Sequence, residues 1–503
     1  MRGKRLAKNT IASLVFQICT LMSGFILPRL ILVSYGSETN GLVNSINQFL
    51  HIISFLELGV GAVVQSSLYK PLAEHNDLEA SKIVVSAGKF FKRIGGILFV
   101  YVIFLMIAYP YMARSYFDHL YTATLIAAIS ISSFAQYYFG VVDRLLLTAD
   151  QRGYLQYNAQ TITLLLNTAI CAFMIVAGAS IHIVKLTTSL IYLARPIVLR
   201  IYVNRTYNIN RKVQYTEEPI KQKWNGIALH VSSSILDGTD NIVLTILASL
   251  SDVSIYSVYH LVVFGVKYLF LSLTNGIQAL LGELWAINDQ KELKRVFGWT
   301  EWVIHTTITL IFGCTGMLIV PFIRVYTIGI NDANYVQPLF SAIIVSAHAI
   351  HCLCQPYNIM IKAGGHYKQT QNNYIIAALI NIIVSVLTVQ LWGLIGVAIG
   401  TFVAMAYQTI WMVIYNSHNL LRWKLSITIK QMFVDIFTVI LCSLATSWIN
   451  MPEISYPGWL IMAFEVFIIW SVLTFLINRI LYKDKTNRLF RAMLNKMNLI
   501  RKD

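Results

Sequence analysis

Residues 34–93 read SYGSETNGLVNSINQFLHIISFLELGVGAVVQSSLYKPLAEHNDLEASKIVVSAGKFFKR, and this stretch decides the class of fold. A short turn with one acidic residue is followed, from Leu42, by a long and mostly apolar run. A loop holding Asn76 and Asp77 comes next, and a further apolar run begins after it. A helix needs about 20 apolar residues to cross the hydrocarbon core of a bilayer, so the stretch predicts a membrane hairpin.

The same plan returns in the second half of the chain. Asp77 has a counterpart in Asp289, which lies in a loop of the same kind. Ala149 and Ala363 each lie at the close of a predicted helix, and their separation along the chain is nearly the same as that of Asp77 and Asp289. Two matches at nearly one offset predict that one half repeats the other. Duplicated halves around a site at the membrane midplane are typical of secondary transporters.

Composition places the chain in a membrane. Hydrophobic residues make up 56% of the 503 residues, and charged residues make up only 12%. Soluble domains carry about 25% charged residues, so this composition is typical of a chain dissolved in lipid. All six cysteines fall in apolar runs, which favours buried thiols over disulfides or a zinc site. The first apolar run has no small-residue cleavage site, so we interpret it as a spanning helix.

The apolar runs predict an all-α polytopic membrane protein with about fourteen spanning helices. Six helices form an N-terminal lobe (1–203), and a cytoplasmic linker (204–225) separates it from a second six-helix lobe (226–418). Two extra helices and a basic tail follow (419–503). The predicted spans are 10–33, 42–66, 94–112, 121–146, 158–179, 183–203, 227–250, 255–281, 302–325, 338–361, 372–391, 393–416, 432–450 and 457–478.

Loop charges predict the orientation of this layout. Lys and Arg accumulate on the cytoplasmic side of membrane proteins, and most of the 39 basic residues fall in alternate predicted loops. Both termini are therefore predicted to be cytoplasmic, and Arg144 and Arg152 are assigned to an inside loop. The net charge of +16 is then explained by the orientation of the protein in the membrane and by attraction to anionic lipid. Nucleic-acid binding is therefore not predicted.

After the basic residues of the loops and span ends are assigned, three remain within the predicted spans: Arg29, Arg195 and Lys267. A charge at the bilayer centre costs about 2.5–3.5 kcal/mol on insertion scales, so each side chain must face protein or water. One interpretation is packing, with Arg29 paired to Glu57 on the next span. The other is a substrate-binding cavity for an anion such as a diphosphate, which suits the two-pronged guanidinium group.

Acidic residues inside the spans leave two further interpretations open. Asp237 and Asp240 lie on the first helix of the second half, the counterpart of the helix that carries Arg29. They either pair with the basic residues or, with Glu57, bind a coupling cation. Asp143 and Asp435 lie near span ends, within predicted reach of the lipid headgroups.

Polar residues form a stripe on the second predicted span. Asn44, Gln48 and His51 follow i, i+4, i+7 spacing, which places them on one helix face. A stripe facing a wet, substrate-binding interior is favoured over hydrogen bonds that hold neighbouring helices together.

No catalytic residue, cofactor or metal site is predicted. The chain contains no Walker loop, nucleotide fingerprint or HExxH motif, so we expect a protein that is not an enzyme. One group of potential metal ligands lies close together in the sequence, namely His348, His351 and Cys352, but no carboxylate lies near them to complete a metal site. Pro356 is expected to bend that helix. Without an ATPase motif, any transport must be passive or run on a gradient.

Three stretches resemble polysaccharide flippases of the Wzx type, in the MOP superfamily that also contains lipid II flippases and the multidrug and toxin extrusion (MATE) transporters. These are LPRLILVSYGSETNGLVNSINQF from Leu27, FLELGVGAVVQSSLYKPLAEHN from Phe55 and ILDGTDNIVLTILASLSDVSIYSVYHLV from Ile235. The resemblance extends over the whole chain in its layout of two six-helix halves plus two helices.

The resemblance implies a two-lobed body that alternates access across a bacterial plasma membrane. The implied substrate is an oligosaccharide linked through diphosphate to undecaprenol, and membrane lipids, a glycan polymerase and a chain-length regulator are the other implied partners. Family members keep basic residues in a central cavity, which fits Arg29, Arg195 and Lys267. Asp237 and Asp240 depart from a purely cationic cavity and keep cation coupling open.

Two rival functions are weighed against the flippase. One is a drug or metabolite antiporter of the MATE type, in which Asp237 or Asp240 binds Na⁺ or a proton; that group usually has twelve spans rather than fourteen. The other is a scaffold or a membrane-embedded enzyme such as a glycan polymerase. A polymerase would carry a large outside loop, and the predicted outside loops are short.

Overall fold

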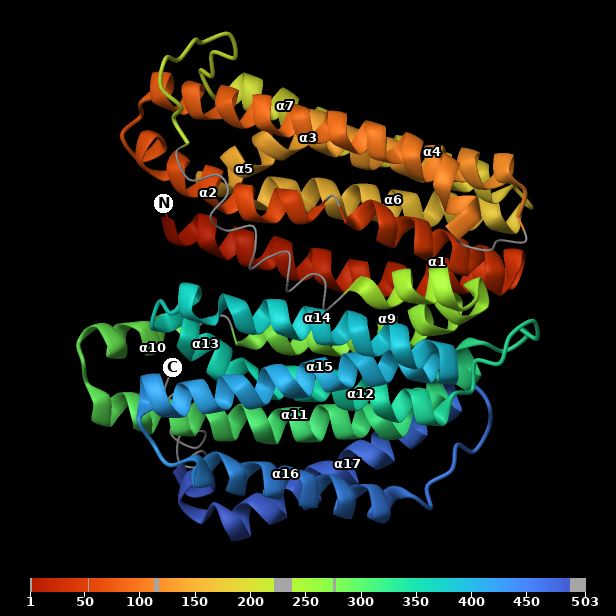
Figure 1. Ribbon diagram of the computed structural model, residues 1–503, viewed down its shortest axis with the longest axis vertical. Helices are drawn as coiled ribbons and strands as arrows, with labels where there is room; N and C mark the ends of the chain where they lie inside the picture. Colours follow the sequence, from red (N-terminus) through yellow and green to blue (C-terminus); the bar gives the residue numbers. More distant parts are fainter. Residues whose placement is uncertain (1, 53, 113–116, 221–237, 275–276, 489–503) are drawn as a thin grey trace, which may run out of the picture. The chain divides into compact units, whose positions relative to one another are not determined.

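The computed structural model describes residues 2–52, 54–112, 117–220, 238–274 and 277–488, and nearly all of them are helical (Figure 1). The first half contains α1 (Arg2–His51), α2 (Ser54–Ala73), α3 (Asp77–Met112), α4 (His119–Ala135), the π-helical turn η1 (Gln136–Gly140), α5 (Val141–Ala149), α6 (Tyr154–Val176) and α7 (Ile181–Thr206). A short helix at Gly238–Leu247 precedes the remaining elements. These are α9 (Leu250–Leu273), α10 (Ile277–Ala286), α11 (Gln290–Tyr326), α12 (Pro338–Leu353), α13 (Gln355–Ala363), α14 (Tyr367–Trp392), α15 (Leu394–Tyr415), the π-helical turn η2 (Asn416–Leu421), α16 (Leu425–Thr446) and α17 (Tyr456–Leu481).

Within the described residues, twelve helices are long and apolar enough to cross a membrane. The predicted class, an all-α multi-pass membrane protein, is confirmed. Predicted span 10–33 and the start of span 42–66 fall together in one of the twelve, Lys8–His51, and span 227–250 lies partly outside the described residues. The total of fourteen spans and the cytoplasmic termini stay predictions.

The contacts divide the chain into two compact units. Unit 1 comprises Met1–Ser257, Gly329–Ala333 and Val389–Leu394, and unit 2 comprises Val258–Ile328, Asn334–Thr388 and Ile395–Asp503. Within unit 1, α1 packs against α6, α4 against α7, and α6 against α7. Within unit 2, α11 is the central helix and contacts α12, α16 and α17.

Gly36 divides α1 into two helical segments. Its φ of +83° and ψ of 173° interrupt the helix, and a positive φ favours glycine because glycine has no Cβ. Asp332, in the same unit, accepts hydrogen bonds from the Ser37 backbone N–H at 2.7 Å and the Ser37 Oγ at 2.6 Å. This carboxylate therefore caps the N-terminus of the second segment, where the helix dipole favours negative charge.

Four predicted spans are broken helices in the structure. Span 42–66 is divided between α1 and α2, and span 255–281 between α9 and α10. Span 121–146 runs through α4, η1 and α5, while span 338–361 is divided at Cys354, close to the expected bend at Pro356. The bend expected near Pro356 is therefore present, whereas the other three breaks were not predicted, because the apolar content of a segment does not reveal a local change in its helical hydrogen bonding.

Backbone turns repeat between the two halves at nearly one offset. His75 and Asn288 have φ of 53° and 56°, and Gln151 and Gly365 have φ of 57° and 74°. The first and last residues of α5 correspond to those of α13 at the same offset that relates Gln151 to Gly365. The predicted repeat of the two halves is therefore present at the level of single turns.

Side-chain hydrogen bonds repeat with the backbone. Asn76 Oδ1 accepts from the Glu79 N–H at 3.0 Å, and Asp289 Oδ1 accepts from the Glu292 N–H at 3.0 Å. Each glutamate also forms an ion pair with a basic residue three positions later. Asp289 therefore corresponds to Asn76, and the predicted match of Asp289 with Asp77 was wrong by one position. Both halves thus start an equivalent helix, α3 or α11, with the same kind of cap.

Candidate functional site

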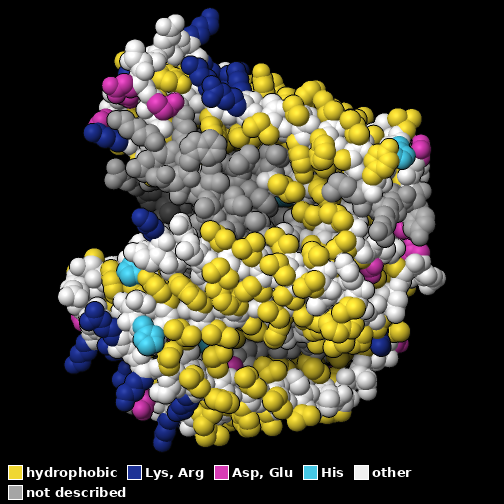
Figure 2. Space-filling model, in the orientation of Figure 1, with side chains coloured by type: hydrophobic (Ala, Val, Ile, Leu, Met, Phe, Trp, Pro, Cys, Tyr) yellow, Lys and Arg dark blue, Asp and Glu magenta, His cyan; other side chains and the backbone are white. Residues whose placement is uncertain are grey.

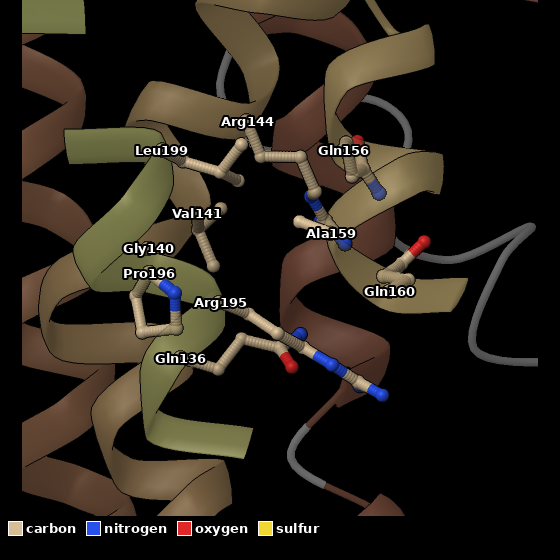
Figure 3. Close-up of a pocket in the computed structure, with 10 residues that line it drawn as sticks. All are labelled: Gln136, Gly140, Val141, Arg144, Gln156, Ala159, Gln160, Arg195, Pro196 and Leu199. Atoms are coloured by element: carbon tan, nitrogen blue, oxygen red, sulfur yellow. The ribbon is translucent and has the colours of Figure 1, made fainter. Parts of the chain in front are cut away.

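The candidate site is a cavity of about 40 Å³ in unit 1, between η1, α5, α6 and α7 (Figure 3). It contains Arg195, one of the three basic residues predicted inside the membrane, and a second arginine, Arg144. The ten lining residues are Gln136, Gly140, Val141, Arg144, Gln156, Ala159, Gln160, Arg195, Pro196 and Leu199.

Local sequence brings these four elements close together. Gly140 ends the π-helical turn, and a Cβ added there would lie 2.9 Å from the Cβ of Pro196 on α7. Pro196 lacks the N–H that would continue the helical hydrogen bonds of α7, which favours a local bend. A π-helical turn changes the direction of the side chains that follow it and often lies at a functional site. In this protein the π-helical turn ends one helical turn before Arg144.

Arg195 is held in a defined orientation by residues of α6 and α7. Its Nε donates to the Thr163 Oγ1 at 2.7 Å, and its guanidinium carbon lies 3.7 Å from the centre of the Tyr192 ring. Thr163 in turn donates to the Ala159 carbonyl at 2.7 Å. Stacking on an aromatic face suits arginine, and a fixed plane prepares the group to bind a planar or tetrahedral oxyanion.

Arg144 was predicted to lie in a cytoplasmic loop, and this assignment was wrong. The residue lies within α5, and Figure 3 shows its side chain directed toward α6 at Ala159. The sequence signal was weak because Arg144 lies close to the end of predicted span 121–146, where a basic residue can reach a loop. Only the π-helical turn and the packing of α5 against α6 and α7 place the two arginines at one cavity.

The cavity has the chemistry of a small anion site. Two arginines and three glutamines are among its ten lining residues, and these ten include no carboxylate. The buried Gln160 Oε1 has no hydrogen-bond partner within the described part of the chain, although buried polar atoms normally have one. A volume of about 40 Å³ admits a few water-sized groups, so an anionic group fits here and an oligosaccharide does not.

The structure places the other two predicted basic residues separately. Arg29 lies half-buried on the first segment of α1 in unit 1, next to Pro28. Lys267 lies on α9 in unit 2 and is only 2% exposed, with its Nζ 4.9 Å from the centre of the Phe264 ring. Because the arginines and Lys267 belong to different units, a common cavity for all three stays a prediction.

The predicted polar stripe lies on the second segment of α1. The Asn44 Nδ2 donates to the Asn40 carbonyl at 2.8 Å and to the Ser257 Oγ at 3.2 Å. The Gln48 amide lies close to the backbone of Gly238, where an added Cβ would be 2.2 Å from the Gln48 Nε2. His51 is exposed at the end of α1. The Asn44 bond therefore supports interhelical packing for that residue, while a substrate role for the stripe stays a prediction.

Of the three predicted acidic residues Glu57, Asp237 and Asp240, the structure describes only the side chain of Asp240. Asp240 is 2% exposed and accepts a hydrogen bond from the Tyr256 hydroxyl at 2.7 Å, within unit 1. Asp237 and the side chain of Glu57 lie outside the described residues. Their roles in pairing or cation coupling stay predictions.

Unit 2 contains a buried acid–base network that sequence analysis missed. Glu301 Oε1 accepts from the Tyr357 hydroxyl at 2.6 Å and from the Thr428 Oγ1 at 2.7 Å. His305 Nδ1 lies 2.6 Å from Asp435 Oδ2. The Tyr357 hydroxyl also lies 3.4 Å from the His305 Nε2, which joins the two pairs. The network ties α16 to α11 and α13.

The prediction that Asp435 reaches the headgroups was wrong. Asp435 is 7% exposed, and its Oδ1 also accepts from the Gln431 Nε2 at 3.0 Å. The error arose because α16 begins at Leu425, well before the predicted start of the span at 432. Glu301 and His305, one helical turn apart on an apolar helix, were a visible signal for this network, but their partner on α16 was not. No group of three or more His, Cys, Asp or Glu suited to a metal ion occurs among the described residues.

No protein-family model matches the chain, and no curated protein matches its sequence. Solved structures do match. One is the lipid II flippase MurJ in an inward closed conformation, with a TM-score of 0.73 and 15% identity over 95% of this chain and 99% of that one. An inward-facing multidrug resistance MATE family transporter of the MOP superfamily matches with a TM-score of 0.63 and 14% identity, over 80% and 95% of the two chains.

A third match is a MOP superfamily transporter from Pyrococcus furiosus, with a TM-score of 0.57 and 13% identity over 83% of this chain and 96% of that one. These structural neighbours are flippases and transporters of the MOP superfamily. The chain therefore has the fold of these membrane transporters, and the part of the predicted resemblance that concerns the fold is confirmed.

Proposed function

We propose that this protein is a Wzx-type flippase. It moves undecaprenyl-diphosphate-linked oligosaccharide repeat units across the bacterial plasma membrane for surface polysaccharide synthesis. The observation that carries the proposal is the likeness to a lipid II flippase over 95% of the chain, at a TM-score of 0.73. The matched MATE transporter covers only 80% of the chain, which supports the flippase over the antiporter.

The chemistry of unit 1 supports an anionic cargo. A lipid-linked oligosaccharide keeps its tail in the bilayer, but its diphosphate and sugars lose water on the way across. In the proposal, Arg195 and Arg144 meet the phosphate through charge-assisted hydrogen bonds, and Arg29 and Lys267 contribute further positive charge. Asn44, Gln48 and His51 offer hydrogen bonds to the sugars. The two lobes then alternate access to the two sides.

The proposal includes partners and a location. The cargo is the lipid-linked oligosaccharide, and the location is the inner membrane of a bacterium. A glycan polymerase and a chain-length regulator are the further proposed partners.

A cation-coupled antiporter of the MATE type is the second candidate. It is supported by the MATE structural neighbours and by the buried carboxylate of Asp240, which is 2% exposed. Asp237 and Glu57 would join Asp240 in coupling. A buried intramembrane carboxylate is costly unless it is paired or binds a cation, which is why the antiporter is retained.

Deletion of the gene in its native host tests the proposal. The lipid-linked oligosaccharide should accumulate on the inner leaflet, and the wild-type gene should clear it. Arg195→Ala should leave most of it uncleared, whereas Arg324→Ala, which changes an exposed arginine at the end of α11, should clear it fully. Arg29→Ala and Lys267→Ala test the remaining positive charge in the same way.

The outcomes separate the two candidates. Clearance by wild type but not by Arg195→Ala supports lipid-linked export with Arg195 in the path of the cargo. Equal clearance by every variant keeps the flippase and removes these residues from its mechanism. A deletion strain that shows no accumulation and keeps its surface glycan would overturn the flippase proposal in favour of the antiporter.

A further inference from the structure

A larger cavity, of about 1070 Å³, lies in unit 2. It is formed by α10, the first turns of α11, the connection from η2 to α16 with the first turn of α16, and the end of α17 with the residues after it. Its volume is slightly above the range of cavities that hold drug-sized ligands, about 300–1,000 Å³. It shares no lining residue with the cavity of Figure 3.

One side of this cavity is strongly basic. Its charged lining residues are Lys294, Arg295, Lys483, Lys485, Arg488 and, as the one acid, Asp484. Arg295 is already paired with Glu292 through two hydrogen bonds, so most of the remaining positive charge comes from the lysines and Arg488. Figure 2 shows Lys and Arg side chains gathered at this end of unit 2, over the turn between α10 and α11.

Lys485 is half-buried at this cavity. Its Nζ donates to the Gly298 carbonyl at 2.8 Å and lies 5.2 Å from the centre of the Tyr482 ring. Burial lowers the pKa of Lys485, Glu301 opposes this shift, and the charge of Lys430 lowers the pKa further. Lys430 also lies 5.2 Å from the Tyr482 ring, on its own helix α16. A negative group in the cavity would stabilise the ammonium group of Lys485.

The other side of the cavity is apolar and aromatic. Leu280, Ile427 and Ile480 line it and are exposed, Ile480 by 77%. Trp299 is 41% exposed, and Trp423 packs edge-to-face on Phe297 with 5.1 Å between ring centres. Tryptophan is typical of the membrane–water interface, where one end of the ring is in lipid and the other meets polar headgroups. This wall would suit acyl chains and not a free, fully hydrated anion.

We propose that this cavity is a binding site for an anionic phospholipid of the adjacent leaflet. The headgroup phosphate would lie among Lys483, Lys485 and Arg488, and the first part of the acyl chains along Ile427 and Ile480. A basic cluster beside an apolar wall matches the two ends of such a lipid, and each nearby Lys or Arg strengthens attraction to anionic lipid. The proposal concerns a resident lipid of the bilayer, so it stands independently of the cargo proposed above.

Native mass spectrometry of the full-length purified protein tests this site. Phosphatidylglycerol and phosphatidylcholine of identical chains are titrated into the detergent-solubilised protein, and bound lipids are counted. We expect a phosphatidylglycerol adduct at concentrations where phosphatidylcholine gives none. The double variant Lys483→Gln/Arg488→Gln should weaken that adduct about tenfold. The double variant Lys291→Gln/Lys368→Gln removes the same charge from exposed positions that do not line the cavity, and should retain the adduct.

A fluorescence arm locates the lipid and excludes a simpler ligand. Phosphatidylglycerol with brominated acyl chains should quench the wild-type protein more than Trp299→Phe. Inorganic phosphate at the same concentration should leave both the adduct and the quenching in place. If inorganic phosphate displaces the phosphatidylglycerol, the site binds a free anion and the lipid proposal is wrong. Equal binding of the two phospholipids, or full binding to Lys483→Gln/Arg488→Gln, would overturn the proposal.

Discussion

The helices α5 and α13 are equivalent elements of the two halves, but they carry different polar side chains. Each has nine residues, each follows a break in a longer helix, and they occupy corresponding positions of the two halves. In α5, Asp143 is fully buried with Arg200 and Arg211, at 3.2 and 2.6 Å, and the next residue, Arg144, lines the unit-1 cavity. In α13, the residue that corresponds to Asp143 is Tyr357, which donates to Glu301.

The difference shows where a duplicated membrane fold is free to diverge. The turns, caps and helix ends are repeated because they satisfy backbone groups that have no other partner in lipid. A polar side chain between helices needs a hydrogen-bond or ion-pair partner, but that partner can be a different residue type in each half. The first half therefore places arginines around α5, and the second half places a carboxylate and a histidine around α13. Five tests address this contrast, beginning with the largest expected effect.

Of the substitutions proposed here, the removal of the Asp143 carboxylate should lower the stability of the protein most. Asp143→Ala leaves two guanidinium groups beside a buried, unfilled position, and we expect a loss of about 2–3 kcal/mol of unfolding free energy. This value is below that of a fully buried pair because Arg200 and Arg211 are partly exposed. Unfolding by SDS in mixed micelles, followed by tryptophan fluorescence, measures it. Glu74→Ala, at an exposed surface pair with Lys70, should leave the midpoint unchanged; an equal shift in both variants would contradict a structural role for Asp143.

The second test asks whether the first half requires a glycine at position 140. The corresponding residue of the other half is Cys354, which carries a side chain. Gly140→Val should destabilise the protein by about 2 kcal/mol, since its side chain would meet Pro196 at 2.9 Å. Thermal unfolding in detergent measures the loss. Gly88→Val, on α3 with open space around the added Cβ, is the matched control. A Gly140 variant as stable as this control would show that α5 and α7 can move apart without cost.

Arg144→Asn gives the first half the residue that α13 has at Asn358. If the unit-1 cavity binds the phosphate of the cargo, clearance of the lipid-linked oligosaccharide should slow about tenfold, as expected for one charge-assisted hydrogen bond. The thermal midpoint should fall much less than for Asp143→Ala. Full clearance by Arg144→Asn would separate the cavity from the transport path while leaving the flippase proposal intact.

Tyr357→Phe probes the second half with a smaller expected effect. Glu301 loses the hydrogen bond from Tyr357 but keeps the one from Thr428, so we expect a loss of about 1 kcal/mol. The same SDS titration measures the difference from wild type. Tyr111→Phe, at a side chain that is 74% exposed, should have no effect. A loss above that of Asp143→Ala would show that the acid–base network, and not the arginine cluster, is the stronger of the two.

The smallest effect is expected at the repeated turns. His75 and Asn288 both adopt a left-handed conformation, which Asn tolerates better than most side chains. His75→Gly should therefore stabilise the protein by about 0.5 kcal/mol, and Asn288→Gly by less. Differential scanning calorimetry of the three proteins gives the order. A larger gain at Asn288 would mean that the two turns are strained differently despite their matching φ values.

Much of the fold was predictable from sequence because its causes are local. Long apolar runs predict helices that must satisfy their backbone hydrogen bonds internally in lipid. Turn residues such as Asn76 and Asp289 mark where the helices end, so the repeat was found to within a single position. Arg195 was also identified as a residue of interest, because a charge inside an apolar run is costly wherever the helix lies.

The tertiary structure alone decided which polar residues meet. Arg144 joins Arg195 because a π-helical turn redirects α5, and Asp435 meets His305 because α16 packs on α11. The larger cavity of unit 2 is likewise assembled from segments as distant along the chain as Leu280 and Arg488. Hydrophobic length is a property of one segment, so sequence reveals it. The partner of a polar side chain depends on how two helices are rotated and broken, and that is settled only when the helices pack.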